Sequence, residues 1–247
     1  MPKVYLLDIE GTVAPLSLVT DQLFPYARTH LSEFLHEHAG DGDVGADLAL
    51  LADENRMETD PSRPEFANVE EIGEALAYLG WLMGMDRKST ALKSLQGKIW
   101  KAGFESGALQ GTLFPDVPPA LEEWSNQAKV AIYSSGSVEA QQLLFRYSNF
   151  GDLTPYLSSY FDTRTGPKTE SSSYTAIAAA MQVEPAEVKF YSDAVRELDA
   201  AREAGCETRL VVRPGNSPIE EGHGHTRIES FLHSGASDEG VGRADTA

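Results

Sequence analysis

The stretch Lys3-Val-Tyr-Leu-Leu-Asp8-Ile-Glu10-Gly-Thr12 joins an apolar run to two carboxylates and a glycine. The run of valine, tyrosine and leucine predicts a short buried strand. Because alternate residues face the same way along a strand, Asp8 and Glu10 could point into one site. Carboxylates at the end of an apolar strand are unfavourable unless a cation or a proton partner is present. An acid–glycine pair can also simply end a strand in a turn, so the stretch needs support from the rest of the chain.

Other segments of the chain repeat this arrangement of an apolar run followed by polar groups. They are Lys129-Val-Ala-Ile-Tyr-Ser134-Ser135-Gly136-Ser137, the polar loop Asp162-Thr-Arg-Thr-Gly-Pro-Lys168, and Val188-Lys-Phe-Tyr-Ser192-Asp193. A predicted helix follows each of them, over Val138–Tyr147, Ser173–Met181 and Val195–Ala204. Strands alternating with helices indicate parallel βαβ units, whose ligands gather at the carboxyl ends of the strands.

We therefore predict an α/β fold, a doubly wound parallel sheet with a helical cap domain inserted after the first strand. Far more residues separate Thr12 from Lys129 than one crossover helix needs. Within this insert, apolar residues recur at helical spacing, as at Ile72, Ala75, Leu76, Leu79 and Met83. The expected boundaries are residues 1–15 and 112–232 for the core, 16–111 for the cap, and 233–247 for a disordered tail.

The order of an aspartate, a serine pair, a lysine and an aspartate at strand ends resembles the haloacid-dehalogenase-like (HAD) hydrolase superfamily. Within it, Asp8-Ile-Glu10-Gly11-Thr12 has glutamate where most of its phosphatases have a second aspartate, a variant similar to the enolase-phosphatases of methionine salvage, also called acireductone synthases. Further stretches resemble that family: Leu23-Phe-Pro-Tyr-Ala27, Leu95-Gln-Gly-Lys-Ile-Trp100, Ile132–Gln141, Phe161–Lys168 and Phe190–Asp193. Val13 departs from it, because a second threonine is expected there.

This resemblance implies a bifunctional, Mg²⁺-dependent phosphoric monoester hydrolase. Its substrate would be 2,3-diketo-5-methylthiopentyl-1-phosphate, which the enzyme would enolise and whose phosphate it would hydrolyse, through an aspartyl-phosphate, to give the acireductone. Asp8 would be the nucleophile. Asp8, Asp193 and the main-chain carbonyl of Glu10 would bind Mg²⁺.

The resemblance also implies the roles of the remaining polar groups. The Glu10 side chain would be the general acid and then the general base. Ser134, Ser135 and Lys168 would bind the phosphoryl oxygens of the substrate. The base for the enolisation step stays open between Glu10 and a residue of the cap.

Each of these residues also has a purely structural interpretation. Asp8 could cap a turn, and Glu10 and Lys168 could be solvated surface charges. The serine pair could cap the next helix, although Ser137 is better placed to do so. Asp193 could cap the helix that begins near Ala194, and could do so while binding a metal.

Composition restricts the class of protein and of partner. The net charge of −18 argues against nucleic acid and anionic membranes as partners, and no apolar run is long enough for a transmembrane helix. The chain reaches its first strand too early for a signal peptide, and its one cysteine, Cys206, cannot form an intrachain disulfide. These features favour a cytoplasmic protein, which we expect to be a monomer. The resemblance implies a small phosphate ester as its partner.

Two local patterns invite metal-site interpretations outside the strand ends. Gly40-Asp-Gly-Asp-Val-Gly45 is predicted to be a flexible exposed loop, because it lacks the ligand spacing and closing glutamate of a calcium loop. The pair His223-Gly-His225 lies in a Gly/Pro-rich segment without further ligands at usable spacing, which favours a polar loop.

Two other functions compete with the enolase-phosphatase. One is a generic phosphatase of the same fold that acts on another small phosphate ester, which Glu10 and the cap stretches disfavour. The other is a non-catalytic module that binds metal or phosphate, which the full set of Asp8, Ser134, Lys168 and Asp193 disfavours. A receiver domain shares the acidic pocket and lysine but is much shorter and lacks a cap.

Overall fold

The computed structural model describes residues 1–218 and 222–233, which form two compact units. The first, here called the sheet unit, comprises residues 1–15, 113–135 and the chain from 153 onward. The second, here called the helical unit, comprises residues 16–112 and 136–152. Most of the tail predicted over 233–247 lies outside the described residues.

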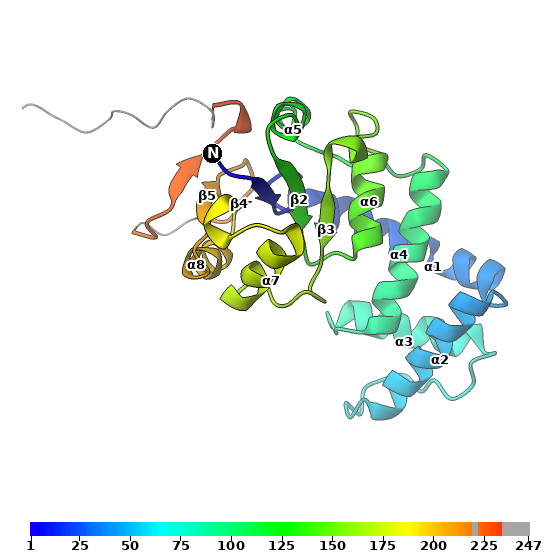
Figure 1. Ribbon diagram of the computed structural model, residues 1–247. Helices are drawn as coiled ribbons and strands as arrows, with labels where there is room; N and C mark the ends of the chain where they lie inside the picture. The colour runs from blue at the N-terminus through cyan, green and yellow to red at the C-terminus, as the bar shows by residue number, and fades with distance from the viewer. Residues whose placement is uncertain (219–221, 234–247) are drawn as a thin grey trace, which may run out of the picture. The chain divides into compact units, whose positions relative to one another are not determined.

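The sheet unit is built on a parallel sheet with strand order β3-β2-β1-β4-β5-β6 (Figure 1). The strands are β1 (Val4–Leu7), β2 (Lys129–Tyr133), β3 (Ser159–Phe161), β4 (Val188–Ser192), β5 (Glu207–Val211) and β6 (Thr226–Ile228). The chain builds outward from β1 to β3 and then returns to pair β4 with the other edge of β1. This reversal beside β1 is the topological switch point at which ligands of such sheets bind.

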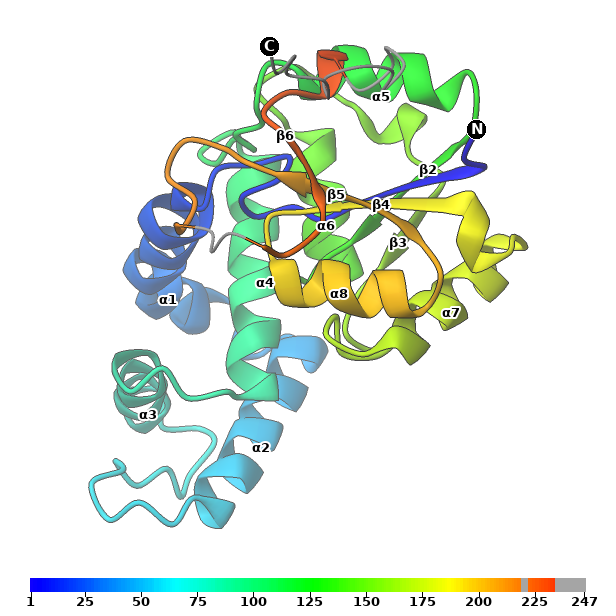
Figure 2. The same ribbon diagram turned by 90° about the vertical axis from the view of Figure 1, so that its left-hand side faces the viewer.

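Helices cover both faces of this sheet, as a doubly wound fold requires (Figure 2). Alternation along β1 explains the two layers. Leu6 packs in one cluster with Tyr174 and Leu198, which belong to α7 (Ser171–Met181) and α8 (Val195–Glu203). Tyr5 faces the other way and stacks on Trp124 of α5 (Val117–Ser125), with ring centroids 4.5 Å apart.

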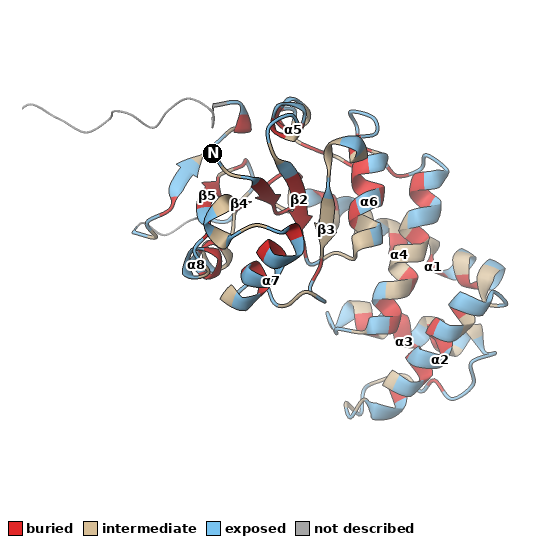
Figure 3. Cartoon of the chain, viewed as in Figure 1, coloured by how far each residue is buried: buried red, intermediate tan, exposed pale blue. Residues whose placement is uncertain are grey.

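The strands β1, β2 and β4 are buried along almost their whole length, as Figure 3 shows. Strands that are covered on both faces have continuous apolar sequences rather than alternating ones. This is why the short apolar runs before Asp8, Ser134 and Asp193 were predictive. The predicted α/β doubly wound sheet is confirmed.

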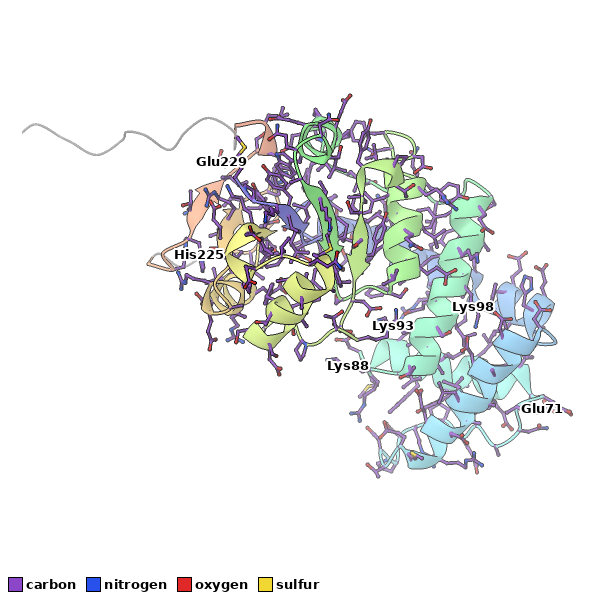
Figure 4. The ribbon with its side chains drawn as sticks, in the orientation of Figure 1. Glu71, Lys88, Lys93, Lys98, His225 and Glu229 are labelled. Atoms are coloured by element: carbon purple, nitrogen blue, oxygen red, sulfur yellow. The ribbon has the colours of Figure 1, made fainter. Side chains whose placement is uncertain are left out.

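The helical unit contains the following elements: the π-helical segment η1 (Leu18–Leu23), α1 (Phe24–His38), α2 (Gly42–Met57), α3 (Ile72–Gly84), α4 (Thr90–Glu105) and α6 (Val138–Arg146). The predicted apolar face of α3 is confirmed, since Ala75 and Leu79 are buried in the cluster that holds this unit together. Ser89 caps α4 by accepting a hydrogen bond from the Leu92 amide. Lys98 of α4, labelled in Figure 4, pairs with Asp47 of α2.

The helical unit differs in two respects from the sequence expectations. The segment from Gly40 to Gly45 is not a loop throughout, because α2 begins at Gly42 and buries Val44 against the unit's core. The unit also includes α6, whereas the predicted cap comprised residues 16–111 only. The assignment of a cap domain itself stays a prediction.

In the part of the chain that the structure describes, none of the helices has the length and apolar character needed to cross a membrane.

Candidate active site

The predicted site residues lie at the carboxyl ends of three neighbouring strands. Asp8 follows β1, Ser134 follows β2 and Asp193 follows β4, and β1 lies between the other two. The Asp8 amide still donates to the Tyr191 carbonyl at 2.9 Å, so the ladder between β1 and β4 extends to Asp8. Asp8 is buried, with 6% of its surface exposed.

A tight turn follows Asp8 and carries Glu10. The Ile9 carbonyl accepts hydrogen bonds from the amides of Thr12, Val13 and Ala14, and the Gly11 amide donates to the Ala14 carbonyl. Gly11 has φ = +70°, a backbone conformation that residues with a side chain adopt only with strain.

Close packing is a second reason for glycine at position 11. A Cβ atom on Gly11 would lie 2.2 Å from Asp193 Oδ2. The glycine therefore allows the turn after β1 to approach the carboxylate at the end of β4.

Lys168 reaches the site from the loop between β3 and α7. Side-chain hydroxyls bind three successive carbonyls of this loop: Tyr133 donates to Gly166, Ser173 to Pro167 and Tyr174 to Lys168, at 2.8, 2.7 and 2.7 Å. The loop is therefore held on β2 and α7, and the ammonium group is directed to the carboxyl end of β1.

The ammonium group of Lys168 lies between two carboxylates. Its Nζ is 2.5 Å from Asp8 Oδ1 and 2.7 Å from Glu197 Oε2, and its side chain is 9% exposed. Burial disfavours the charged form, but the negative charges of Asp8 and Glu197 outweigh burial and raise the pKa of Lys168. Lys168 is therefore a permanent cation beside Asp8.

The carboxylates of the site outnumber this ammonium group. Burial and the charge of Asp8 raise the pKa of Glu10, and burial with the charges of Asp8 and Glu197 raises the pKa of Asp193 to about 7. Carboxyl groups with a raised pKa are typical of sites that transfer protons or bind cations. The site can therefore hold additional positive charge.

The donor set fits a hard divalent cation such as Mg²⁺. Asp8 and Asp193 offer carboxylate oxygens at neighbouring strand ends, and these are the oxygen ligands that Mg²⁺ prefers. Among residues 1–218 and 222–233, no group of three or more His, Cys, Asp or Glu side chains is arranged to hold a metal ion. Mg²⁺ usually binds through one or two carboxylates and completes its shell with substrate and water.

The two predicted phosphate-binding serines occupy different environments. Ser134 is buried and its amide donates to the Phe161 carbonyl at 3.2 Å, whereas Ser135 is exposed. Ser137, not the pair, caps α6 by accepting from the Ala140 amide. The serine pair is therefore not needed as the helix cap.

The N-cap position of α8 is occupied by Ala194, not by Asp193, and Ala194 has no side chain that could accept a capping hydrogen bond. The Ser192 hydroxyl accepts the hydrogen bond from the Ala194 amide instead, at 3.1 Å.

Glu197 and Ser192 are site residues that sequence reasoning missed. Glu197 pairs with Lys168 and accepts a hydrogen bond from Ser192 at 2.9 Å. The available signal was its position four residues after Asp193, in the first turn of the predicted helix, which places its side chain over the strand end. No local signal distinguishes Ser192 from a serine that simply ends a strand.

His225 and Cys206, which lie away from the strand ends that carry the candidate site, pack as parts of the fold. His225 lies in a loop before β6 (Figure 4), is buried, and its ring nitrogens contact Thr208 at 2.8 Å and Asp199 at 3.1 Å. Burial raises the pKa of the Cys206 thiol to about 11, so it is an inert core residue.

Comparison with known proteins agrees with this geometry. The family model of haloacid dehalogenase-like hydrolases matches residues 2–205. The protein named enolase-phosphatase E1 of Synechococcus elongatus is 53% identical over 227 residues, which cover 92% of this chain and 94% of that protein. The chain belongs to the enolase-phosphatase E1 family of haloacid dehalogenase-like hydrolases.

Two further relatives define the reach of this similarity. A rice protein named as a probable bifunctional methylthioribulose-1-phosphate dehydratase/enolase-phosphatase E1 is 44% identical, and the match covers 92% of this chain but 46% of that protein. The solved structure of the UTR4 protein from Saccharomyces cerevisiae is 34% identical with a TM-score of 0.78, covering 94% of this chain and all of that one. The similarity therefore extends over both units of the chain.

Proposed function

We propose that this chain is the Mg²⁺-dependent enolase-phosphatase of methionine salvage, which enolises 2,3-diketo-5-methylthiopentyl-1-phosphate and hydrolyses its phosphate to give the acireductone. The observation that carries the proposal is the buried pair of Asp8 and Lys168 at the switch point of the sheet, beside Asp193 and Glu10. The naming of close relatives as enolase-phosphatases supports the substrate class.

Asp8 is the proposed nucleophile. Its carboxylate attacks phosphorus, a bond from Asp8 oxygen to phosphorus forms, and the bond from phosphorus to the substrate alkoxide breaks. Lys168 keeps Asp8 oriented by binding Oδ1, and it offsets negative charge on the phosphoryl oxygens together with the hydroxyls of Ser134 and Ser135.

Glu10 is the proposed acid and base. Burial and the charge of Asp8 raise its pKa, which suits a carboxyl that donates a proton to the leaving alkoxide. The resulting carboxylate then takes a proton from the water that hydrolyses the aspartyl-phosphate. Its position two residues beyond the nucleophile, on a turn fixed against Ile9, suits it to serve both steps.

Asp8, Asp193 and the Glu10 carbonyl are the groups that would hold Mg²⁺. When bound, the ion would neutralise charge between the aspartate and the phosphate and would acidify the C–H beside the substrate's carbonyl group. We further propose a cytoplasmic location, because the one cysteine is a buried thiol.

The test uses purified protein, the diketone phosphate and Mg²⁺. Enediol absorbance and phosphate release are followed together, and EDTA should abolish both signals. Asp8→Asn should stop phosphate release, while Asp53→Asn, a change at an exposed carboxylate of α2, should leave both rates unchanged. Phosphate release only from other esters would refute the pathway assignment, and phosphate release by Asp8→Asn would refute the nucleophile.

A further inference from the structure

The segment that follows β5 holds the turn that carries Glu10, although it contains none of the residues assigned above. Asn216 Nδ2 donates to the Gly11 carbonyl at 3.0 Å, and Arg213 Nε donates to the Thr12 carbonyl at 3.1 Å. These are consecutive carbonyls, directly after Glu10 in the chain. Since β4 lies between β5 and β1 in the sheet, the segment reaches past the end of β4 to make both contacts.

Arg213 is a buried guanidinium group held by two rings, an ion pair and backbone carbonyls through Nε and Nη1, while its Nη2 has no hydrogen-bond partner among the described residues. It lies between the rings of Phe114 and Phe231, at 4.5 and 4.7 Å from their centroids, and its side chain is 5% exposed. Nη1 pairs with Asp116 Oδ2 at 2.9 Å and also donates to the carbonyl of Glu229, which is labelled in Figure 4. Stacking and pairing fix the plane of the guanidinium group, so the Nε–H that binds Thr12 has one direction.

The amide of Asn216 is fixed in the same way. Nδ2 faces two carbonyls, those of Gly11 and Val211 at 3.0 and 3.4 Å, and only the NH₂ group can donate to them. Oδ1 must therefore point away from these carbonyls. It is buried without a hydrogen-bond partner among the described residues, and a Cβ atom on Gly11 would contact both Oδ1 and the Asp193 carboxylate.

We propose that Arg213 and Asn216 are positioning residues that clamp the catalytic turn and thereby set the place of the Glu10 carboxyl. The turn bonds internally through the Ile9 carbonyl, which leaves its Gly11 and Thr12 carbonyls for the clamp. Neither Arg213 nor Asn216 is assigned contact with the reacting atoms. This inference rests on the proposed function, in which Glu10 protonates the leaving group.

The consequence of a loosened clamp depends on the leaving group. An alkoxide needs a proton as the bond to phosphorus breaks, whereas the p-nitrophenolate ion leaves readily without one. The quantity kcat/KM counts only the steps up to release of this group, so hydrolysis of the aspartyl-phosphate does not affect it. A displaced Glu10 therefore lowers kcat/KM for an alkyl phosphate much more than for p-nitrophenyl phosphate.

The experiment compares Asn216→Ala, Arg213→Lys and Glu10→Gln on the diketone phosphate and on p-nitrophenyl phosphate. Glu10→Gln should lose about 10²-fold or more on the alkyl ester and less than about tenfold on the aryl ester. The two clamp variants should lose about tenfold to 10²-fold on the alkyl ester and less than about threefold on the aryl ester. Arg227→Lys, at an exposed arginine of β6, is the control and should change neither.

Each outcome separates the clamp from the proposed function. Equal losses on both esters by the clamp variants, or no loss in variants that melt like the wild type, would overturn the clamp while Glu10→Gln still supports the acid. If Glu10→Gln itself showed no dependence on the leaving group, the acid assignment would fail, and the clamp with it. Arg213→Lys keeps the buried charge beside Asp116, so the test does not depend on a variant that leaves that carboxylate unpaired.

Discussion

Replacement of Gly11 by alanine tests the close approach between Asp193 and the turn that carries Glu10. The added Cβ would lie 2.2 Å from Asp193 Oδ2, whereas ordinary contacts begin at 3.4 Å. The carboxylate or the turn must therefore move by about 1 Å, and a displacement of this size in an active site can lower the rate by about 10²-fold. At about 1.4 kcal/mol for each factor of ten, this corresponds to about 3 kcal/mol of transition-state stabilisation.

A second glycine separates this effect from backbone strain. Gly11 and Gly107 have φ of +70° and +77°, so alanine at either position adopts the left-handed region and loses about 1 kcal/mol of stability. Nothing lies within 4 Å of a Cβ atom on Gly107, which follows α4. The two variants therefore share the backbone cost and differ in the clash.

The assay measures kcat/KM at saturating Mg²⁺, the Mg²⁺ dissociation constant by calorimetry, and the free energy of unfolding in urea. Gly11→Ala should lose about 10²-fold in kcat/KM and bind Mg²⁺ more weakly, while Gly107→Ala should retain both. If the two variants had equal activity and equal Mg²⁺ affinity, the close packing of Gly11 on Asp193 would have no functional role.

Two further predictions concern residues that the motifs do not include. Glu197→Gln should lower kcat/KM by about tenfold, because Lys168 loses one of the two negative charges that hold its ammonium group. The matched control is Glu203→Gln, on the exposed side of α8. Equal activity of the two variants would exclude a role for Glu197. Burial lowers the pKa of His225 below 6.5, so the unfolded chain binds a proton before the folded chain does as the pH falls. The contribution of neutral His225 to the free energy of unfolding is therefore complete above pH 6.5 and declines as the pH falls below it. Urea titrations from pH 8 to 5 should therefore show a smaller decline for His225→Asn than for wild type or for His36→Asn, an exposed position on α1, and identical slopes would contradict the assignment.

The strand ends of this protein could be predicted because the information is local. Asp8, Ser134 and Asp193 each follow an apolar run, and a strand buried on both faces needs such a run whatever surrounds it. Parallel strands place their carboxyl ends together, so the order of the motifs along the chain was enough to gather these residues at one edge. Lys168 was assigned from the resemblance to a known family, since a lysine in a polar loop has no local signal for its partner.

Other features had no local signal. The α2 helix begins within Gly40–Gly45, a segment rich in glycine and aspartate, because Val44 packs into the core of the helical unit and tertiary burial outweighs local propensity. His225 also sits in a Gly/Pro-rich segment, yet its ring is buried against Thr208 and Asp199.

Local sequence is enough to predict the parallel sheet, the end of the sheet at which the candidate site lies and the residue types gathered there, because strand burial and side-chain alternation act over a few residues. How these groups are held depends on contacts between distant parts of the chain. Arg213 and Asn216 contact carbonyls 201 and 205 residues earlier in the chain, and Lys168 contacts a carboxylate 160 residues earlier. Such contacts depend on the order of strands in the sheet, which places β4 beside β1 and brings the end of β5 past it. The residues next to a given position in the sequence do not indicate the order of the strands in the sheet.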